Sequence, residues 1–195
     1  MKGIVEIIGD VVKEMSGNLT IVMPADIEMP ADIENDRFEE VKNPELNYIF
    51  GSAQYVKDKL DEYSKVPSTS ERKFPLVVLF CPVTEKRDSQ DYYSKVSLNI
   101  LIACSSTKSW SNERRLYASF INILRPVYER LIEVIKNDGR FDMDYDNIIP
   151  HDYSENYSYG RYGAYTESGE AVSEPIDAIN IRSMELIVKN QSCCR

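Results

Sequence analysis

The run FPLVVLFCP, residues 74–82, constrains the fold of this chain more than any other stretch. Side chains alternate between the two sides of a strand, and here both sides are apolar: one holds Phe74, Leu76, Val78 and Phe80, the other Val77, Leu79 and Cys81. A strand that is apolar on both sides belongs in the interior of a sheet. Pro75 and Pro82 lack the N–H that a sheet ladder needs, so they mark its two ends. The run therefore predicts a central strand.

The run 93–106 predicts the strand next to it. Ser97 and Asn99 lie on its polar side, and its apolar side holds Val96, Leu98, Ile100, Ile102 and Cys104. Strict alternation of this kind is typical of a half-buried strand. We expect an antiparallel hairpin of 74–82 with 93–106, joined through a charged turn at 84–91.

A further strand is predicted over 176–189. Ile179 and Ile181 share one phase of the alternation, whereas Met184, Leu186 and Val188 share the other. Because a change of phase places one extra residue in the strand, we expect a β-bulge near Ser183.

Three stretches predict helices. Residues 3–15 are apolar at helical spacing and stop before Gly17. Ser52 can cap a helix that runs to about Tyr63, and Ser111 can cap another over 112–137. Pro126 lies inside the last of these and predicts a kink or a break.

These elements, with short strand-like runs at 19–23 and 47–52, predict one α+β domain over residues 1–195. Strands and helices do not alternate in a βαβ rhythm. We therefore expect a mainly antiparallel sheet of about four strands, with helices packed on one face and with extended loops or arms.

A perfect tandem hexapeptide, MPADIEMPADIE, fills residues 23–34. Pro24 and Pro30 exclude it from a central strand, and two copies are too few for a solenoid. Two interpretations stay open for the stretch 24–40. It is an exposed connection lengthened by duplication, or it is an acidic arm that reaches a neighbouring subunit.

Tyrosines crowd the stretch from Gly139 to Glu174, which is too long for an idle loop in a compact domain. We expect an extended arm at 142–174. Tyrosine combines a large rigid surface with a hydrogen-bonding tip and is enriched in protein interfaces. The candidate subunit-interface residues are Tyr153, Tyr157, Tyr159, Arg161, Tyr162 and Tyr165. A loop folded back onto its own domain is the open alternative.

The net charge of −9 argues against specific binding to DNA or RNA, because nucleic-acid affinity rests on lysine and arginine at phosphates. A surface past which DNA must slide should be acidic for the same reason. No apolar run is long enough to span a bilayer. The N-terminal residues do not resemble a signal peptide, so we expect a protein made in the cytoplasm and no contact with membranes.

Motifs for chemistry are weak, so the sequence predicts no catalytic residue, metal site or cofactor. Asp142, Asp144 and Asp146 begin like a calcium loop, but its required glycine and glutamate are missing. The SxxK pattern at 105–108 follows a strand and lacks its companion motifs. His151 is a single histidine beside Asp152. Cys81 and Cys104 lie in apolar runs, and Cys193 and Cys194 are adjacent, which leaves no zinc-type pattern.

The chain resembles a group of virion proteins from tailed phages along most of its length, from about Tyr48 to Lys189. The most specific part is a strand followed by Thr-x-x-Trp (107–110) and a helix with Arg-Pro-Val-Tyr-Glu (125–129). In order, the matching pieces are NYIFGSAQYVKDKL, KFPLVVLFCPVTE, LNILIACSSTKSWSNERRLYASFINILRPVYERLIEVI, IIPHDYSENYSYG and EPIDAINIRSMELIVKN. The group is that of tail-terminator and neck-ring (head-tail connector) proteins, as in crAss-like and other Bacteroidetes phages.

The resemblance implies a structural protein without a reaction. It would form a homo-oligomeric ring, six-fold on a tail tube or twelve-fold beside a portal. Its other partners would be portal, neck or tail proteins, and DNA would pass through the lumen without specific binding. The protein would reside in the virion after assembly in the host cytoplasm. The alternative hypothesis is a cytoplasmic α+β enzyme or small-molecule-binding domain with a site near His151.

Overall fold

The computed structural model describes residues 2–25, 37–65, 73–87, 93–107, 109–143, 146–162 and 174–189. Most of the MPADIE repeat, Lys108, Asp144, Tyr165 and the two C-terminal cysteines lie outside these residues. The elements, in chain order, are α1 (Ile4–Met15), β1 (Thr20–Pro24), β2 (Phe38–Lys42), β3 (Asn47–Gly51), α2 (Ala53–Lys65), β4 (Leu76–Phe80), β5 (Thr84–Arg87), β6 (Tyr93–Ser105), α4 (Asn112–Arg115), the π-helical segment η1 (Leu116–Leu124), α5 (Arg125–Asn137), β7 (Phe141–Asp142), β8 (Asp152–Tyr162) and β9 (Glu174–Lys189).

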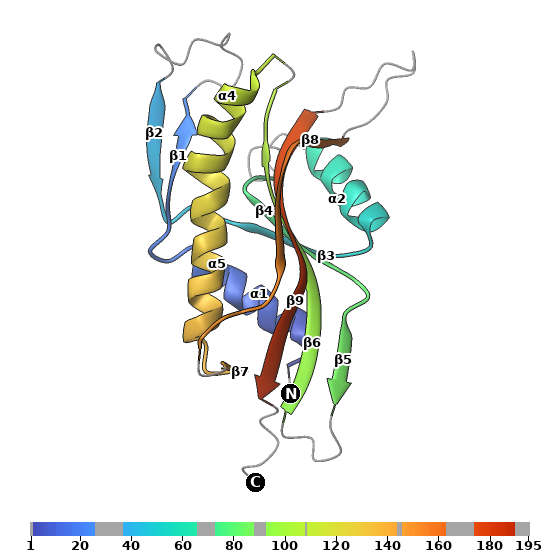
Figure 1. The fold of residues 1–195 in the computed structure, drawn as a ribbon. Helices are drawn as coiled ribbons and strands as arrows, with labels where there is room; N and C mark the ends of the chain where they lie inside the picture. The colour runs from blue at the N-terminus through green and yellow to red at the C-terminus, as the bar shows by residue number, and fades with distance from the viewer. Residues whose placement is uncertain are drawn as a thin grey trace.

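Seven of the described strands form one curled, mixed sheet, and β1 and β2 form a separate antiparallel pair. β6 and β9 pair along most of their length at the centre (Figure 1). β4 and β5 follow one another along the outer edge of β6, while β8 and β7 pair with β9. The expectation of an α+β fold is confirmed. The prediction of a mainly antiparallel sheet of about four strands is wrong, because the sheet is mixed and has seven described strands.

Two features of the chain explain this difference. First, β5 and β8 are rich in charged or polar residues and tyrosine, so β5 was expected as a turn and β8 as part of an arm. Second, β3 is parallel to β4, and α2 connects them in chain order. A parallel pair needs such a crossover, so one βαβ unit exists where none was predicted.

Helices cover both faces of the sheet, not one face as expected. On the first face, α1, η1 and α5 enclose the even-numbered residues of β6, including Leu98, Ile100 and Ile102. On the second face, α2 covers only the upper part of the sheet, where its buried side packs on Leu101 and Ala103 of β6. Figure 1 shows α5 and α2 on opposite sides of the strands. The predicted position of β4 in the interior of the sheet is confirmed, and its two apolar sides face these two helical layers.

The helical stretch predicted over 112–137 is present as α4, η1 and α5. The Ser111 Oγ accepts from the Arg114 N–H at 3.2 Å, as expected of a helix cap. Pro126 lies at the start of α5 and has no N–H to donate. The nine residues before α5 take the wider π-helical pattern, and the Arg125 N–H donates to the Phe120 carbonyl five residues earlier. The irregularity expected at Pro126 therefore takes the form of π-helical turns.

The bulge predicted near Ser183 is confirmed. The register between β6 and β9 shifts between Leu98 and Ile100. Ser183 has a φ of 52°, in the left-handed region, and its N–H donates to the Asn99 Oδ1 at 3.1 Å. This bond gives the backbone donor of the extra residue a partner from the neighbouring strand.

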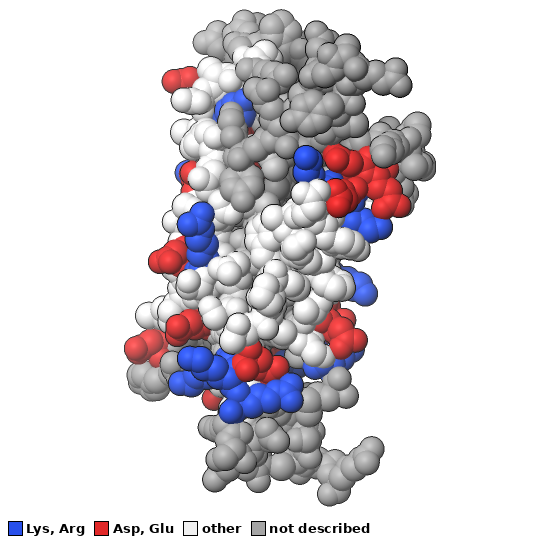
Figure 2. Space-filling view, turned by 90° about the vertical axis from the view of Figure 1, so that its right-hand side faces the viewer, with Lys and Arg blue, Asp and Glu red and all other residues white. Residues whose placement is uncertain are grey.

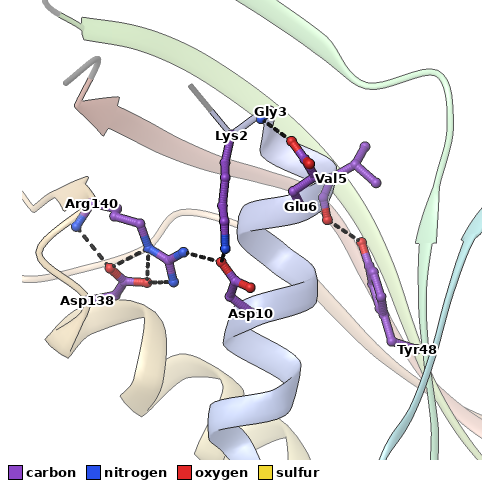
Figure 3. Close-up of polar contacts among 8 residues, drawn as sticks. All are labelled: Lys2, Gly3, Val5, Glu6, Asp10, Tyr48, Asp138 and Arg140. Atoms are coloured by element: carbon purple, nitrogen blue, oxygen red, sulfur yellow. Dashed lines mark hydrogen bonds and ion pairs between the residues drawn. The ribbon is translucent and has the colours of Figure 1, made fainter. Parts of the chain in front are cut away.

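Helix α1 belongs to the main core. Ile8, Val11 and Met15 are fully buried. Figure 3 shows its polar contacts: the Asp10 carboxylate accepts from Lys2 at 2.6 Å and from Arg140, beyond α5, at 2.8 Å. On its other side the Tyr48 hydroxyl of β3 donates to the Val5 carbonyl at 2.9 Å. The pKa of Asp10 is lowered, first by the hydrogen bond from Lys2.

Candidate interaction surface

The structure places the predicted interface residues on a sheet strand. β8 runs antiparallel to β9, and Tyr153 faces Ile181 across the pair. Residues 152–162, expected within an extended arm, are therefore held in the sheet. Tyr153 and Tyr157 are exposed at their side chains. Tyr159, Arg161 and Tyr162 lie on the same strand, without described side chains, and Tyr165 lies outside the described residues.

Several large side chains on η1, α5 and β8 are exposed or half-buried; we call Tyr117, Ile121, Tyr128, Tyr153 and Tyr157 the aromatic strip. Tyr117, Ile121, Tyr153 and Tyr157 keep 44%, 42%, 41% and 37% of their surface exposed. The Tyr157 ring lies 4.4 Å from that of Phe120, and the Tyr153 ring 4.8 Å from that of Tyr128. Ring contacts between the helix and β8 therefore hold Tyr128, Tyr153 and Tyr157 in place, whereas the Tyr117 ring contacts that of Phe38 in β2.

A bidentate ion pair lies within the aromatic strip. The Arg125 Nε and Nη2 donate to the two carboxylate oxygens of Glu155 at 2.7 and 3.1 Å. The Tyr153 hydroxyl donates to the same carboxylate at 2.6 Å. The hydrogen bond from Arg125 lowers the pKa of Glu155, whereas burial, then the carboxylate, raises the pKa of the Tyr153 hydroxyl. Both charges are paired inside the surface, so the strip carries no net charge from them.

His151 joins the start of β8 to α5. Its Nδ1 lies 2.7 Å from the Ile149 carbonyl oxygen, and its Nε2 lies 2.8 Å from the Tyr128 hydroxyl. A carbonyl only accepts, so in the neutral ring Nδ1 carries the proton and Nε2 accepts from Tyr128. Burial raises the pKa of that hydroxyl. Both ring nitrogens are thus engaged, which suits a positioning role better than proton transfer to a substrate.

A buried ion pair beneath the strip was missed by the sequence analysis. The Arg115 Nη1 donates to the Asp177 Oδ1 at 2.7 Å, with side-chain exposures of 4% and 0%. Ser119 donates to the other carboxylate oxygen at 2.8 Å. These bonds connect the helix to β9. The sequence holds one aspartate within the apolar run of β9 and one arginine on the apolar side of a helix. Because buried charges require partners, these two positions could have indicated a buried ion pair.

Cys104 lies close to this pair. Burial, then the Asp177 charge, raises the pKa of its thiol to about 12. The thiol is therefore protonated at neutral pH and behaves as the buried apolar side chain that the sequence predicted.

The other sequence candidates do not converge on a site within the described residues. Asp142 pairs with Lys189 at 3.2 Å, and no group of three potential metal ligands occurs there. No helix in the described ranges has the length and apolar character that crossing a membrane requires.

Comparison with known proteins adds no identification: no protein-family model matches this chain, and no curated protein matches it.

Proposed function

We propose that this chain is a structural virion protein that forms a homo-oligomeric ring in the neck or tail of a tailed phage. The head-tail connector and the tail terminator are its two possible positions. The observation that carries the proposal is the aromatic strip, in which large side chains stand in solvent on a helix and a strand. The resemblance of residues 48–189 to such proteins supports it.

The aromatic strip has the properties of a surface that binds protein. Tyrosine and arginine are enriched in the centres of protein interfaces. The ring contacts of Tyr153 and Tyr157 with the helix fix these side chains before binding, so little side-chain entropy is lost on association. Because Arg125 and Glu155 are already paired, covering them does not leave an isolated charge in the interface. We infer that the strip contacts a neighbouring copy in the ring.

The charge of the chain agrees with passage of DNA. A net charge of −9 repels phosphates. In the proposed ring the acidic surface faces the lumen, where it keeps DNA from adhering during ejection. Other portal, neck or tail proteins would close the two ends of the ring.

Size measurement followed by electron microscopy tests the proposal. We expect particles of one size with a central hole. Ile121→Asp should abolish or weaken assembly, since it places a charge in the aromatic strip. Tyr55→Asp is the matched control, because Tyr55 is 47% exposed on α2, away from the strip. A monomer at all concentrations, or equal effects of both variants, would contradict the proposed interface.

The alternative, a small-molecule or enzyme site near His151, has the half-exposed His151–Tyr128 pair as its support. Thermal-shift measurements with a metabolite library test it. Ligand-induced stabilisation that disappears in His151→Ala and persists in Tyr55→Asp would favour this alternative over the ring.

A further inference from the structure

A groove lies on the second face of the sheet, below the part that α2 covers. Lys95 and Ser97 share the odd-numbered side of β6 with Leu101 and Ala103, which meet α2. Further down, the sheet is open, and a hollow of about 230 Å³ is bounded by β5, β6, β9, Asp142, Met143 and residues 148–150. Figure 2 shows this face, with Lys and Arg side chains gathered at its lower end and acidic side chains among them.

The floor of the groove carries two adjacent lysines. Lys86 of β5 and Lys95 of β6 are direct cross-strand partners, and both are exposed. Like charges at directly opposed positions destabilise a strand pair, so a carboxylate bound between them relieves repulsion. Two acids also line the groove, but Asp142 is paired with Lys189. Glu185 lies one row away, opposite Ser97.

One wall of the groove is apolar. Met143, Ile148, Ile149 and Pro150 line it; Ile148 keeps 64% of its surface exposed and Pro150 is also exposed, whereas Ile149 is buried in the main core. A ligand for this groove therefore needs an aliphatic side chain for the wall and carboxylates for the two lysines. An acidic peptide with spaced isoleucines has this chemistry.

The chain itself contains such a peptide. Residues 26–36 carry five acidic side chains and no basic one, and they include Asp26-Ile27-Glu28 and Asp32-Ile33-Glu34. In each triplet an isoleucine stands between two carboxylates. The flexible four-carbon stems of two lysines can reach carboxylates on both sides of a seated isoleucine.

This segment cannot reach the groove of its own molecule. It leaves the end of β1 and returns at the start of β2, where the Ala25 N–H donates to the Arg37 carbonyl. Phe38, the first residue of β2, contacts Tyr117 near the start of η1. This end of the β1–β2 pair therefore lies on the first face of the sheet, near the upper end of the long helix (Figure 1). Each half of an eleven-residue loop reaches at most ~20 Å. The stretch from Lys95 to Ser105 alone spans ~33 Å along β6, and the sheet lies between.

We propose that residues 26–36 of one copy dock in this groove of the next copy. The contact joins different surfaces on the two copies, so it repeats head to tail and closes a ring if the rotation permits. In this proposal each copy of the tandem hexapeptide supplies one Asp-Ile-Glu triplet to the contact. The inference deepens the ring proposed above and rests on it.

A mixing experiment tests the docking. One full-length variant, Lys86→Glu/Lys95→Glu, has a defective groove and an intact arm. The other has an intact groove and a neutral arm: Asp26→Asn/Glu28→Gln/Asp32→Asn/Glu34→Gln/Asp36→Asn. Both variants also carry Ile121→Asp, which disrupts the proposed strip contact, so sedimentation velocity should show each variant alone as a monomer. Their mixture should give a one-to-one complex, because one intact arm meets one intact groove. No complex in the mixture would overturn the docking.

A labelled peptide of residues 23–36 gives an independent measurement on the neutral-arm variant, whose groove is free. The groove reversal, made in that background, should weaken peptide affinity about tenfold, as expected for two reversed surface charges. Lys13→Glu/Lys57→Glu is the matched control with the same net charge, since both lysines are exposed away from the groove. Equal loss in both would mean nonspecific attraction and would overturn the inference.

The two proposals fail separately. Rings that persist when either the groove defect or the arm defect is made in the wild-type chain would refute the arm while leaving the ring. Docking in the mixture without any ring from the wild-type chain would refute the ring while leaving the arm and groove as a contact between copies.

Discussion

Removal of the buried charge of Asp177 should destabilise the fold severely. Asp177 is fully buried and accepts from Arg115 at 2.7 Å and from Ser119 at 2.8 Å. The substitution Asp177→Asn keeps the shape of the side chain but leaves the Arg115 guanidinium, itself 4% exposed, without a counter-charge. Breaking a buried pair in this way costs about 3–5 kcal/mol. Thermal midpoints of chains of this size fall by roughly 2–4 °C per kcal/mol, so we expect a drop of about 6–20 °C.

Urea unfolding followed by far-UV circular dichroism measures this cost. Asp152→Asn is the control, because Asp152 is exposed at the start of β8. The double variant Arg115→Met/Asp177→Asn should recover part of the loss, since it removes the unpaired charge as well. A cost of Asp177→Asn below about 1 kcal/mol, or no recovery in the double variant, would refute a desolvated pair.

Three further predictions concern the ion pair of Glu155, the end of β3 at Gly51 and the bulge at Ser183. The hydrogen bond from Arg125 lowers the pKa of Glu155. The ionised Glu155 therefore stabilises the fold above the ordinary glutamate pKa of 4.5, and this stabilisation is lost as pH falls through the lower pKa of the folded state. Acid unfolding of Glu155→Gln should show a shallower pH dependence in this range, and profiles identical to the wild type would contradict the pairing. Gly51→Ala should cost about 1–3 kcal/mol in urea unfolding, because φ is +148° and a Cβ would lie 2.7 Å from the Tyr55 ring; an unchanged midpoint would show this backbone to be unstrained. Ser183→Val should cost about 1–2 kcal/mol in thermal melts, since a β-branched residue disfavours a φ of 52°; a stabilised variant would argue against the bulge.

Strands with regular apolar alternation could be predicted from the sequence. The central position of β4, the inward side of β6 and the bulge near Ser183 all followed from the spacing of aliphatic residues. The strands β5 and β8 could not, because their residues are polar or aromatic and their strand state comes from pairing with β6 and β9. The second helical layer was missed because α2 has few apolar residues, although the two apolar sides of β4 already required cover on both faces.

The candidate site was predictable in part. Tyrosine enrichment indicated Tyr153 and Tyr157, but composition does not show which helix meets a strand. The contacts of Arg125 with Glu155 and of Tyr128 with His151 join residues 30 and 23 positions apart, and no local pattern encodes such distances. The contacts of Arg125 and Tyr128 with β8 and His151 are therefore features of the folded chain that the sequence did not indicate.

We propose above that this polypeptide is a ring component of a phage particle. Labelling purified virions with an antibody to the chain, viewed by electron microscopy, tests it most directly. We expect several copies per particle, all at one axial position in the neck or at a tail end. Absence of the chain from purified, infectious virions would contradict it.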